Sequence, residues 1–314
     1  MRSLKFILIA GVTCLTLLVS NGCITTALII HHKLKQADML EDWEKEDGTI
    51  VKDIVYDAEK NLAYDLYLPA HPEQKKAQYA MIFLHGGSWN SGDKKDVSYA
   101  CRRFARAGYV TVTLNYSLAK EKGPPITFFT MLDDITRCLT HLKQEMAKRN
   151  IKLKKIALSG YSAGGHLAML YAFAYREKSP LPIAFVFQQV GPALFTPEAW
   201  NNKTEFALAL ASAGAGKKIT EEDHKQGRSL DVIKTISPAL LVDKNTVPGI
   251  HAYGAKDSLV RPPHGAALEK ALKKHNVPHD MVNYTNSGHF LCDDPEQAQK
   301  YRKLVLEYAD RYFR

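Results

Sequence analysis

The sequence predicts an α/β protein with a mostly parallel central sheet and helices on both faces. Short apolar runs rich in β-branched residues alternate with segments of helical spacing from residue 65 to the C-terminus. Such an alternation builds parallel sheets that are covered on both sides. The chain has 314 residues, of which 46% are hydrophobic and 24% charged, so it has the length and composition of a globular protein with a sizeable core.

The individual elements follow from the period of the apolar residues. Strands are expected at 65–69, 80–85, 109–116, 155–160, 183–190, 249–254 and 279–284. Helices are expected at 97–108, 130–149, 163–175, 265–274 and 295–312. The helix at 130–149 places five apolar side chains on one face, as a helix packed on a sheet does: Leu132, Ile135, Leu139, Leu142 and Met146.

One interval interrupts this alternation. More than fifty residues separate Val190 from Val247 without a strand pattern, and they include the small-residue run FALALASAGAG. Long insertions within a compact domain are usually functional, such as a lid over a site. We therefore predict a cap insertion around 192–246.

The N-terminal thirty residues differ from the rest of the chain. Arg2 and Lys5 precede an uncharged segment, 6–30, that is long enough to span a bilayer as a helix. Residues 1–30 are interpreted as a signal or anchor segment, 31–50 as a charged tether and 51–314 as the folded domain. A retained anchor, a cleaved signal and lipidation at Cys23 in LVSNGC remain alternatives, and each places the domain outside the cytoplasm.

Charge and cysteine content exclude two classes of function. The formal net charge is +9, but basic and acidic residues are interleaved, and no basic run carries the stacking aromatics of a nucleic-acid binder. Beyond the first thirty residues, Cys101, Cys138 and Cys292 lack metal-ligand spacing. Cys101 and Cys138 lie on apolar helical faces and are interpreted as buried thiols, although a disulfide among the three stays open.

The stretch GYSAGG at 160–165 carries the main chemical signal. It lies between an expected strand and an expected helix, which is the context in which GxSxG forms a sharp turn with an exposed serine. Ser162 is thus a candidate nucleophile at a helix N-terminus, where free N–H groups favour developing negative charge.

A serine nucleophile needs a base, and the base needs an orienting acid. In hydrolases with this sharp strand-to-helix turn, here called the elbow, the chain order is serine, acid, histidine. Asp257 follows the expected strand 249–254, and His289 follows the expected strand 279–284. Because parallel strands assemble their sites at their carboxyl ends, we predict a Ser162, Asp257 and His289 triad.

The third part of the site is HGGSW at 85–89, directly after the expected strand 80–85. Adjacent glycines allow the backbone to turn its N–H groups towards an oxyanion. Gly86, Gly87 and Ser88, together with Ala163, are the predicted donors. A substrate pocket is predicted from Trp89, Phe195, Trp200 and Gln188 or Gln189.

Other polar residues near these motifs are given structural roles. His166 is expected to pack or cap locally, His251 lies within a strand, and His264 is expected at the surface. Asp294 precedes proline and is expected to cap the last helix.

Together these motifs resemble a known family. HGGSW, GYSAGG, GAKDSLV and NSGHF, with YDLYLP at 64–69 and NYSLA at 115–119, are similar to α/β-hydrolase esterases of the hormone-sensitive-lipase-like and the acetyl-xylan or feruloyl esterase groups. The resemblance covers the chain from about residue 50 and implies the α/β-hydrolase fold, no cofactor, and ester hydrolysis through an acyl-enzyme. The sequence has HGGS where the hormone-sensitive-lipase branch has HGGG, and YSLAKE where that branch has YRLAPE. HGGSW with YDLYLP is more similar to the branch that acts on small acyl groups, including acetylated sugars, and to kynurenine formamidases.

Three functions fit these residues. The first is a serine esterase for acetyl-type or short-chain esters, with a small-molecule or carbohydrate substrate, no metal and no nucleic-acid partner. The second is an amidase, peptidase or formamidase with the same triad. The third is a non-catalytic binding protein tethered to the membrane by residues 1–30.

Overall fold

A computed structural model describes residues 43–119 and 125–314 of the chain. The predicted N-terminal segment 1–30 lies outside the described residues. Within the described part, no helix has the length and apolar character needed to cross a membrane.

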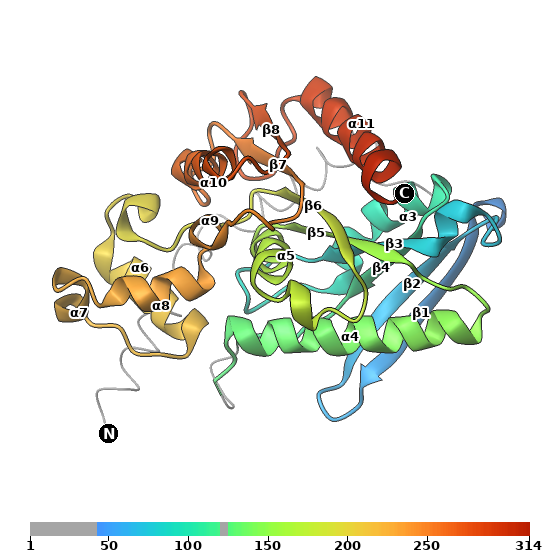
Figure 1. The fold of residues 1–314 in the computed structure, drawn as a ribbon, viewed down its shortest axis with the longest axis horizontal. Helices are drawn as coiled ribbons and strands as arrows, with labels where there is room; N and C mark the ends of the chain where they lie inside the picture. Colours follow the sequence, from blue (N-terminus) through green and yellow to red (C-terminus); the bar gives the residue numbers. More distant parts are fainter. Residues whose placement is uncertain (1–42, 120–124) are drawn as a thin grey trace, which may run out of the picture.

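One eight-stranded sheet forms the centre of the molecule, in the order β1-β2-β4-β3-β5-β6-β7-β8 (Figure 1). The strands are β1 (Gly48–Asp57), β2 (Leu62–Pro69), β3 (Tyr79–Leu84), β4 (Val110–Leu114), β5 (Lys155–Tyr161), β6 (Ile183–Gln189), β7 (Gly249–Gly254) and β8 (His279–Tyr284). Strands β4, β3, β5, β6, β7 and β8 are parallel, whereas β1 and β2 pair antiparallel. The predicted α/β class with a mostly parallel sheet is confirmed.

Strand β1 is absent from the sequence prediction. Its side chains are half-buried or exposed throughout, and its pairing with β2 is interrupted by two irregularities. It therefore shows neither a continuous apolar run nor strict alternation. β1 begins at Gly48, within the stretch interpreted as a tether, and the ring of Trp43 contacts that of Tyr67 at 6.1 Å. The packed part of the chain thus begins before residue 51.

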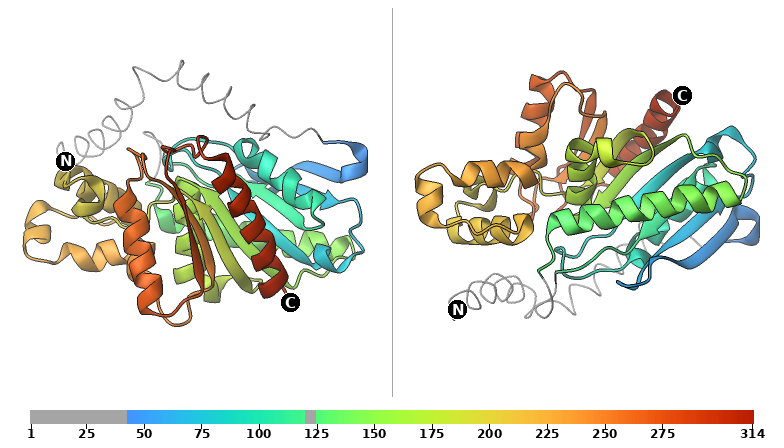
Figure 2. Two further views of the ribbon diagram at one scale, coloured as in Figure 1. Left: turned by 90° about the horizontal axis from the view of Figure 1, so that it is seen from above. Right: turned by 60° about the horizontal axis from the view of Figure 1, so that its bottom comes forward.

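Alternate residues of the buried strands point to opposite faces of the sheet. On β3, Met81 and Phe83 pack under α3 (Ser98–Arg106) and α11 (Pro295–Tyr312), whereas Ile82 and Leu84 pack under the helices of the other face. That second face carries α4 (Phe128–Lys148), α5 (Ala163–Ala174) and α10 (Pro262–Lys274). Figure 2 shows α4 running across it. The two-layer cover explains why the parallel strands are buried along their whole length.

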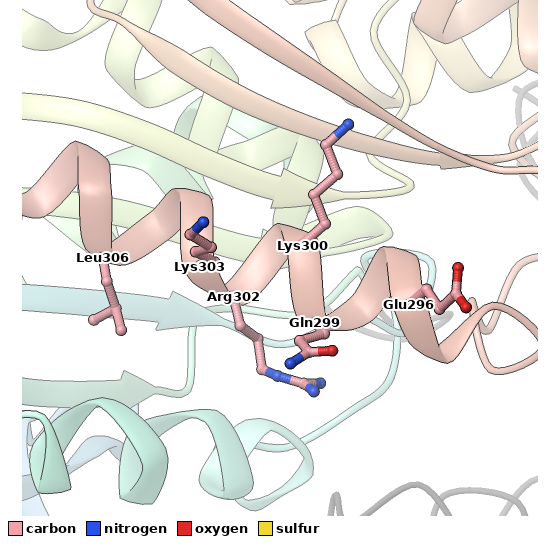
Figure 3. A pocket seen from close by; sticks show the side chains of 6 residues that line it. All are labelled: Glu296, Gln299, Lys300, Arg302, Lys303 and Leu306. Atoms are coloured by element: carbon pink, nitrogen blue, oxygen red, sulfur yellow. The ribbon is translucent and has the colours of Figure 1, made fainter.

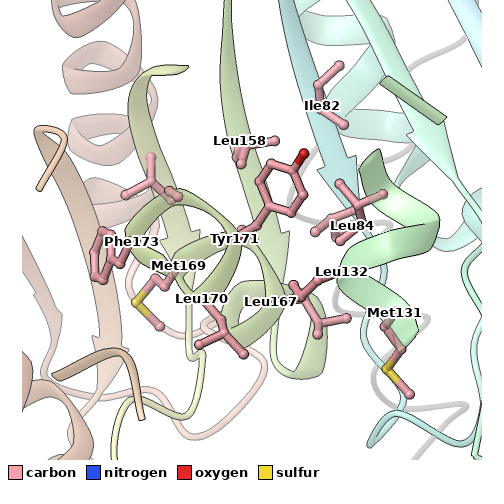
Figure 4. Packing of buried hydrophobic residues seen from close by; sticks show 14 of the residues in the cluster. Ile82, Leu84, Met131, Leu132, Leu158, Leu167, Met169, Leu170, Tyr171 and Phe173 are labelled. Carbon is pink, nitrogen blue, oxygen red and sulfur yellow. The ribbon is translucent and has the colours of Figure 1, made fainter. Parts of the chain in front are cut away.

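Helix α5 contributes many side chains to the hydrophobic core (Figure 4). Leu167, Leu170 and Tyr171 are fully buried between the sheet and α4, and the Tyr171 hydroxyl lies 3.0 Å from Thr136 Oγ1. Burying a leucine side chain is worth about 1.5–3 kcal/mol. The helix that begins directly after Ser162 is therefore held rigidly against the strand that precedes it.

The insertion between β6 and β7 contains the 3₁₀ helix η5 (Pro197–Trp200) and the helices α6 (Thr204–Ala215), α7 (Glu221–Lys225), α8 (Ser229–Ile236) and α9 (Pro238–Leu241). These helices extend beyond the carboxyl end of the sheet (Figure 1). Helix α6 approaches α4 closely, because a Cβ on Gly214 would lie 2.1 Å from the Phe128 ring. The insertion is thus packed on the α4 side of the fold.

The prediction that Cys101 and Cys138 are buried thiols is confirmed. Cys101 and Cys138 are fully buried free thiols, and burial raises the pKa of each well above its ordinary value. Cys292 is a half-buried thiol. None of the three forms a disulfide within residues 43–119 and 125–314.

Candidate active site

The turns that follow four parallel strands meet at one edge of the sheet. Leu84 of β3 pairs with Gly160 of β5, and Gly254 of β7 pairs with Tyr284 of β8, so these strands end at corresponding levels. The predicted oxyanion loop, nucleophile, acid and base each follow one of these strands. Parallel topology alone therefore brings segments 85–89, 162, 257 and 289 together.

Ser162 occupies the sharp turn that GxSxG predicts. Its backbone has φ 53° and ψ −119°, a strained conformation for a residue with a side chain. The neighbouring glycines are required by close packing: a Cβ on Gly160 would lie 2.2 Å from the Gly164 carbonyl, and a Cβ on Gly164 would lie 2.1 Å from the Leu84 oxygen. The close packing at these glycines keeps the turn in this strained conformation, which places the serine hydroxyl above the strand ends.

The three predicted triad side chains are in contact. His289 Nε2 lies 3.0 Å from Ser162 Oγ, and His289 Nδ1 lies 2.8 Å from Asp257 Oδ2. The side chain of Asp257 is fully buried and that of His289 is 9% exposed. Geometry of this kind lets the imidazole take a proton from the hydroxyl while the carboxylate holds the ring orientation.

The second oxygen of Asp257 is also fixed. Its Oδ1 accepts hydrogen bonds from the backbone N–H groups of Leu259 (2.8 Å) and Val260 (2.9 Å). Together with His289, three donors compensate a carboxylate that is removed from water. The turn after β7 therefore supplies two of the three donors that position the carboxylate.

The loop after β3 turns tightly beside the elbow. A Cβ on Gly86 would lie 3.4 Å from the Ser162 Cβ, and Gly87 has φ 111°, which favours glycine. The Gly87 carbonyl accepts from the N–H groups of Asn90 and Ser91 at 3.1 and 3.0 Å. His85 supports the loop from below, because its ring stacks on Tyr116 at 4.3 Å.

The predicted oxyanion donors carry N–H groups without an internal acceptor. Among the described residues, the backbone N–H groups of Gly87, Ser88 and Ala163 have no hydrogen-bond acceptor. Ser88 has φ 52°, a left-handed conformation that does not occur in a regular strand or helix. Ala163 opens α5, where the helix dipole adds to the field of the N–H group. These donors lie on the two segments that flank Ser162, as an oxyanion hole requires.

Two supporting residues escape the sequence analysis. The Tyr161 hydroxyl donates a hydrogen bond to the His289 carbonyl, and the two rings meet edge to face at 5.5 Å. Asp294 is the N-cap residue of α11 and precedes a proline, as predicted, but its side chain makes no capping hydrogen bond. Instead its carboxylate accepts from the Asn286 N–H at 3.0 Å and from the Ser287 hydroxyl at 2.6 Å. The Tyr161 bond joins residues 128 positions apart in the chain, and the Asp294 bonds span the turn that carries His289. No local sequence pattern reveals either of them.

Asp294 is therefore expected to hold the turn that carries His289. Burial alone would raise its pKa, but hydrogen bonds from Ser287 and Asn286 outweigh burial and lower it. We expect Asp294→Ala to lower the stability by about 1–3 kcal/mol through lost hydrogen bonds. We expect kcat to fall about tenfold with little change in KM, because the base is misplaced.

Asp310→Ala, on the exposed side of the same helix, is the matched control. Steady-state kinetics and urea denaturation of both variants test this prediction. An Asp294→Ala protein with wild-type kcat and stability would contradict it.

Of the residues predicted to line a pocket, the three aromatic ones lie together beside the elbow, whereas Gln188 has a structural role. Trp89 and Phe195 are buried in a group of rings beside the elbow, and Trp200 is half-buried at its edge. Gln188 is fully buried and does not line a pocket: its side-chain oxygen accepts from the Gly191 N–H at 2.7 Å. Gln188 thus secures the turn after β6. Gln189, at the end of β6, accepts the Ser162 N–H through its backbone carbonyl at 2.9 Å.

Two histidines adjoin the same rings. His166 is buried and packed, but its partners are distant in the chain and not local as predicted: its Nε2 donates to the Ile236 carbonyl at 2.9 Å. His264 is fully buried, so its predicted surface position is wrong. Its Nδ1 accepts from the N–H groups of Ala193 and Leu194, both at 3.3 Å. The insertion folds back over the start of α10 and covers this residue.

Two surface hollows lie elsewhere. One follows α11 and is lined by Glu296, Gln299, Lys300, Arg302, Lys303 and Leu306 (Figure 3). The other lies between β1 and α4 and is lined by Tyr56, Thr136, Arg137, Thr140, His141 and Gln144. Neither contains a triad residue. In the described part of the chain no group of three or more His, Cys, Asp or Glu side chains is arranged to hold a metal ion.

Known proteins share this architecture. Esterase B from Lactobacillus rhamnosis superimposes with a TM-score of 0.71 at 19% identity, covering 99% of this chain and 96% of that one. A truncated carbohydrate esterase from gut microbiota superimposes with a TM-score of 0.69 at 19% identity, covering 87% of this chain and all of that one. These likenesses show the α/β-hydrolase fold.

Sequence comparison covers a shorter region. Probable carboxylesterase 7 of Arabidopsis thaliana is 28% identical over 130 residues, which are 39% of this chain and 41% of that protein. This chain thus spans less than half of that relative. The BD-FAE family model matches residues 64–272, which include the oxyanion loop, the elbow and the acid. Since that match extends over more than half of the sequence, the chain belongs to the BD-FAE family of α/β-hydrolase esterases.

Proposed function

We propose that this protein is a serine carboxylic ester hydrolase that acts on acetyl-type or other short-chain esters through an acyl-enzyme. One observation carries the proposal: His289 contacts both Ser162 Oγ, at 3.0 Å, and the buried carboxylate of Asp257, at 2.8 Å. The names of the carboxylesterase and esterase relatives support the same chemistry.

In the first half-reaction Ser162 Oγ forms a bond to the acyl carbon while its proton passes to His289 Nε2. The carbonyl oxygen becomes negative and accepts hydrogen bonds from the N–H groups of Ala163 and of Gly87 or Ser88. The bond from carbon to the alcohol oxygen then breaks, and His289 returns the proton to that oxygen. The alcohol leaves, and the acyl group stays on Ser162.

In the second half-reaction water replaces the alcohol. His289 Nε2 takes a proton from the water as its oxygen bonds to the acyl carbon. The ester bond to Ser162 breaks, the hydroxyl regains its proton from His289, and the carboxylic acid leaves. Asp257 keeps Nδ1 of His289 protonated and the ring in place throughout.

The surroundings of Ser162 favour a small acyl group. Trp89 and Phe195 are at most 5% exposed and belong to a group of packed rings beside the elbow. A long hydrocarbon chain would have to displace several packed rings, whereas an acetyl group needs little room. The carbohydrate esterase among the structural neighbours makes acetylated sugars a reasonable alcohol class to test.

A panel of nitrophenyl esters from acetate to dodecanoate tests the proposal, with acetylated xylan and formylkynurenine assayed in parallel. We expect the highest kcat/KM for acetate to butyrate and no turnover by Ser162→Ala. Preferred cleavage of formylkynurenine would favour a formamidase. If wild type and Ser162→Ala were equally inactive on every substrate, a binding protein would replace the enzyme proposal.

We further propose that residues 1–30 attach the catalytic domain to a membrane, on its extracytoplasmic side. The uncharged segment 6–30 supports this proposal. Mass spectrometry of the mature N-terminus tests it. An intact Met1 indicates an anchor, a diacylglyceryl group on Cys23 indicates a lipoprotein, and a new N-terminus beyond residue 30 would contradict attachment.

A further inference from the structure

Six rings form one contact group beside the nucleophile, here called the ring cluster: Trp89, Phe128, His166, Phe195, Trp200 and His264. Successive rings meet at 5.4 Å (Trp89 to His166), 4.9 Å (His166 to Phe195), 5.9 Å (Phe195 to Trp200) and 4.8 Å (Trp200 to His264). They come from the oxyanion loop, α4, α5, the insertion and α10, so the fold assembles them from five separate segments.

The ring cluster contains four buried polar nitrogens that have no hydrogen-bond partner among the described residues. They are Trp89 Nε1, His166 Nδ1, Trp200 Nε1 and His264 Nε2. Buried polar atoms are normally paired, because leaving one unpaired costs its full desolvation free energy. Four in one contact group, next to a candidate nucleophile, point to a ligand that pairs with them.

The hydrogen bonds of the two histidines define what each free nitrogen offers. His166 donates from Nε2 to a carbonyl, so its Nδ1 is an acceptor. His264 accepts two N–H groups at Nδ1, so its Nε2 carries the proton and is a donor. Burial lowers the pKa of His166 to about 4 and that of His264 to about 3, so both rings are neutral at pH 7.

With the two indoles, the ring cluster thus presents three N–H donors and one acceptor, and its members carry no formal charge. A hydroxyl group accepts up to two hydrogen bonds and donates one, so it can pair with two of the three donors and with the acceptor. A carboxylate would bring a negative charge without a cation to pair it, and it could not donate to His166 Nδ1. A purely hydrocarbon group would leave all four nitrogens unpaired.

The ring cluster lies on the acyl side of the ester. His289 must protonate the leaving alcohol, so the alcohol lies beside Nε2 of that ring. The rings that contact His289 are Tyr161 and Phe290, neither of which belongs to the ring cluster. Trp89 follows the oxyanion donors directly, and the His166 N–H donates to the Ser162 carbonyl. The acyl chain, attached to the other side of the carbonyl carbon, therefore extends towards these rings.

We propose that the ring cluster is an acyl subsite selective for short acyl groups that carry a hydroxyl, with the hydroxyl bound by Trp200 Nε1, His264 Nε2 and His166 Nδ1. This inference rests on the proposed esterase function and names its acyl class. A site built to bind a substrate hydroxyl discriminates strongly against an analogue without it.

Matched esters test the inference: ethyl glycolate against ethyl propanoate, and ethyl 3-hydroxybutanoate against ethyl 3-methylbutanoate, followed by pH-stat titration. Each pair exchanges a hydroxyl for a methyl group of similar size. Dividing the kcat/KM ratio of a pair by its ratio in hydroxide-catalysed hydrolysis removes intrinsic reactivity. We expect the corrected preference of wild type for the hydroxylated ester to be about tenfold or more.

Trp200→Phe keeps a ring and removes the N–H, and we expect it to reduce the corrected preference about three- to tenfold, in line with the loss of one hydrogen bond. His264→Asn keeps an acceptor near the Nδ1 position, removes the Nε2 donor, and should reduce the preference similarly. Trp43→Phe is the matched control, since Trp43 contacts Tyr67 and Arg106 on the β2 and α3 side of the fold.

A wild-type preference equal to the hydroxide ratio, with normal hydrolysis of ethyl acetate, would overturn this inference and leave the esterase proposal standing. The same holds if Trp200→Phe and Trp43→Phe have equal preferences. If no ester is hydrolysed faster by wild type than by Ser162→Ala, the proposed function fails and this inference fails with it.

Discussion

Ser162→Ala is expected to lower kcat for nitrophenyl acetate about 10⁶-fold while KM changes little, because the variant binds ester but has no oxygen to acylate. The side chain is small and stands at the start of α5, so the fold should persist. Circular dichroism of the variant checks that it does. A burst of nitrophenol equal to the enzyme concentration in wild type, absent in the variant, would report the acyl-enzyme directly.

The other two residues have different expected effects, and the difference tests their roles. His289→Ala should be as severe as Ser162→Ala, and the double variant no worse than either, because the two groups act in one proton transfer. Asp257→Asn should cost about 10⁴-fold, since it alters the imidazole tautomer but leaves the other two groups in place. His71→Ala, which changes an exposed histidine, is the control. Losses that multiply in the double variant would contradict a shared step.

The triad could be predicted from sequence because each member is placed by local rules. Ser162 lies in a glycine-bounded turn, and Asp257 and His289 each follow a recognisable buried strand. In a parallel sheet the ends of such strands meet without any further information. The same reasoning predicted the oxyanion loop, of which the structure places Gly86 beside Ser162.

Most of the elements and residues that the sequence placed wrongly depend on contacts with distant segments of the chain. Strand β1 is recognised only through its pairing with β2, because none of its side chains is fully buried. His264 follows two prolines and was expected at the surface, yet the insertion buries it. Gln188 lies near the carboxyl end of β6 and was therefore predicted to line the pocket, but its side-chain oxygen accepts a hydrogen bond from the Gly191 N–H. Strand β1 and His264 have their partners in other segments, whereas Gln188 bonds within the turn that directly follows β6.

Acid should destabilise this protein well above the pH at which carboxylates protonate. Burial lowers the pKa of His251 and of His264 to about 3 and that of His166 to about 4, from an ordinary value of 6.5. Burial also lowers the pKa of His85. The native state therefore keeps these rings neutral, whereas the unfolded chain binds protons below about pH 6.5.

The sign follows from proton counting. Above pH 6.5 neither state is protonated at these rings, so they do not alter stability with pH. Below that value the unfolded state binds more protons, and the free energy of unfolding falls as pH decreases towards the folded pKa values. At pH 5 each of His166, His251 and His264 should cost about 2 kcal/mol, or about 6 kcal/mol together, which is comparable to the whole stability of a typical domain.

Urea denaturation at pH 5, 5.5, 6, 7 and 8 measures this effect, and one substitution separates it from general acid sensitivity. His251 is fully buried within β7, so His251→Asn removes one titrating ring from the core. Whatever that variant loses in stability at pH 8, the slope of its free energy of unfolding against pH between 5 and 6 should decrease by about 1.2 kcal/mol per pH unit. His71→Asn removes an exposed imidazole and should leave the slope unchanged. Equal slopes for wild type and His251→Asn would show that the buried rings accept protons in the native state, and the neutral histidines assigned to the ring cluster would then need revision as well.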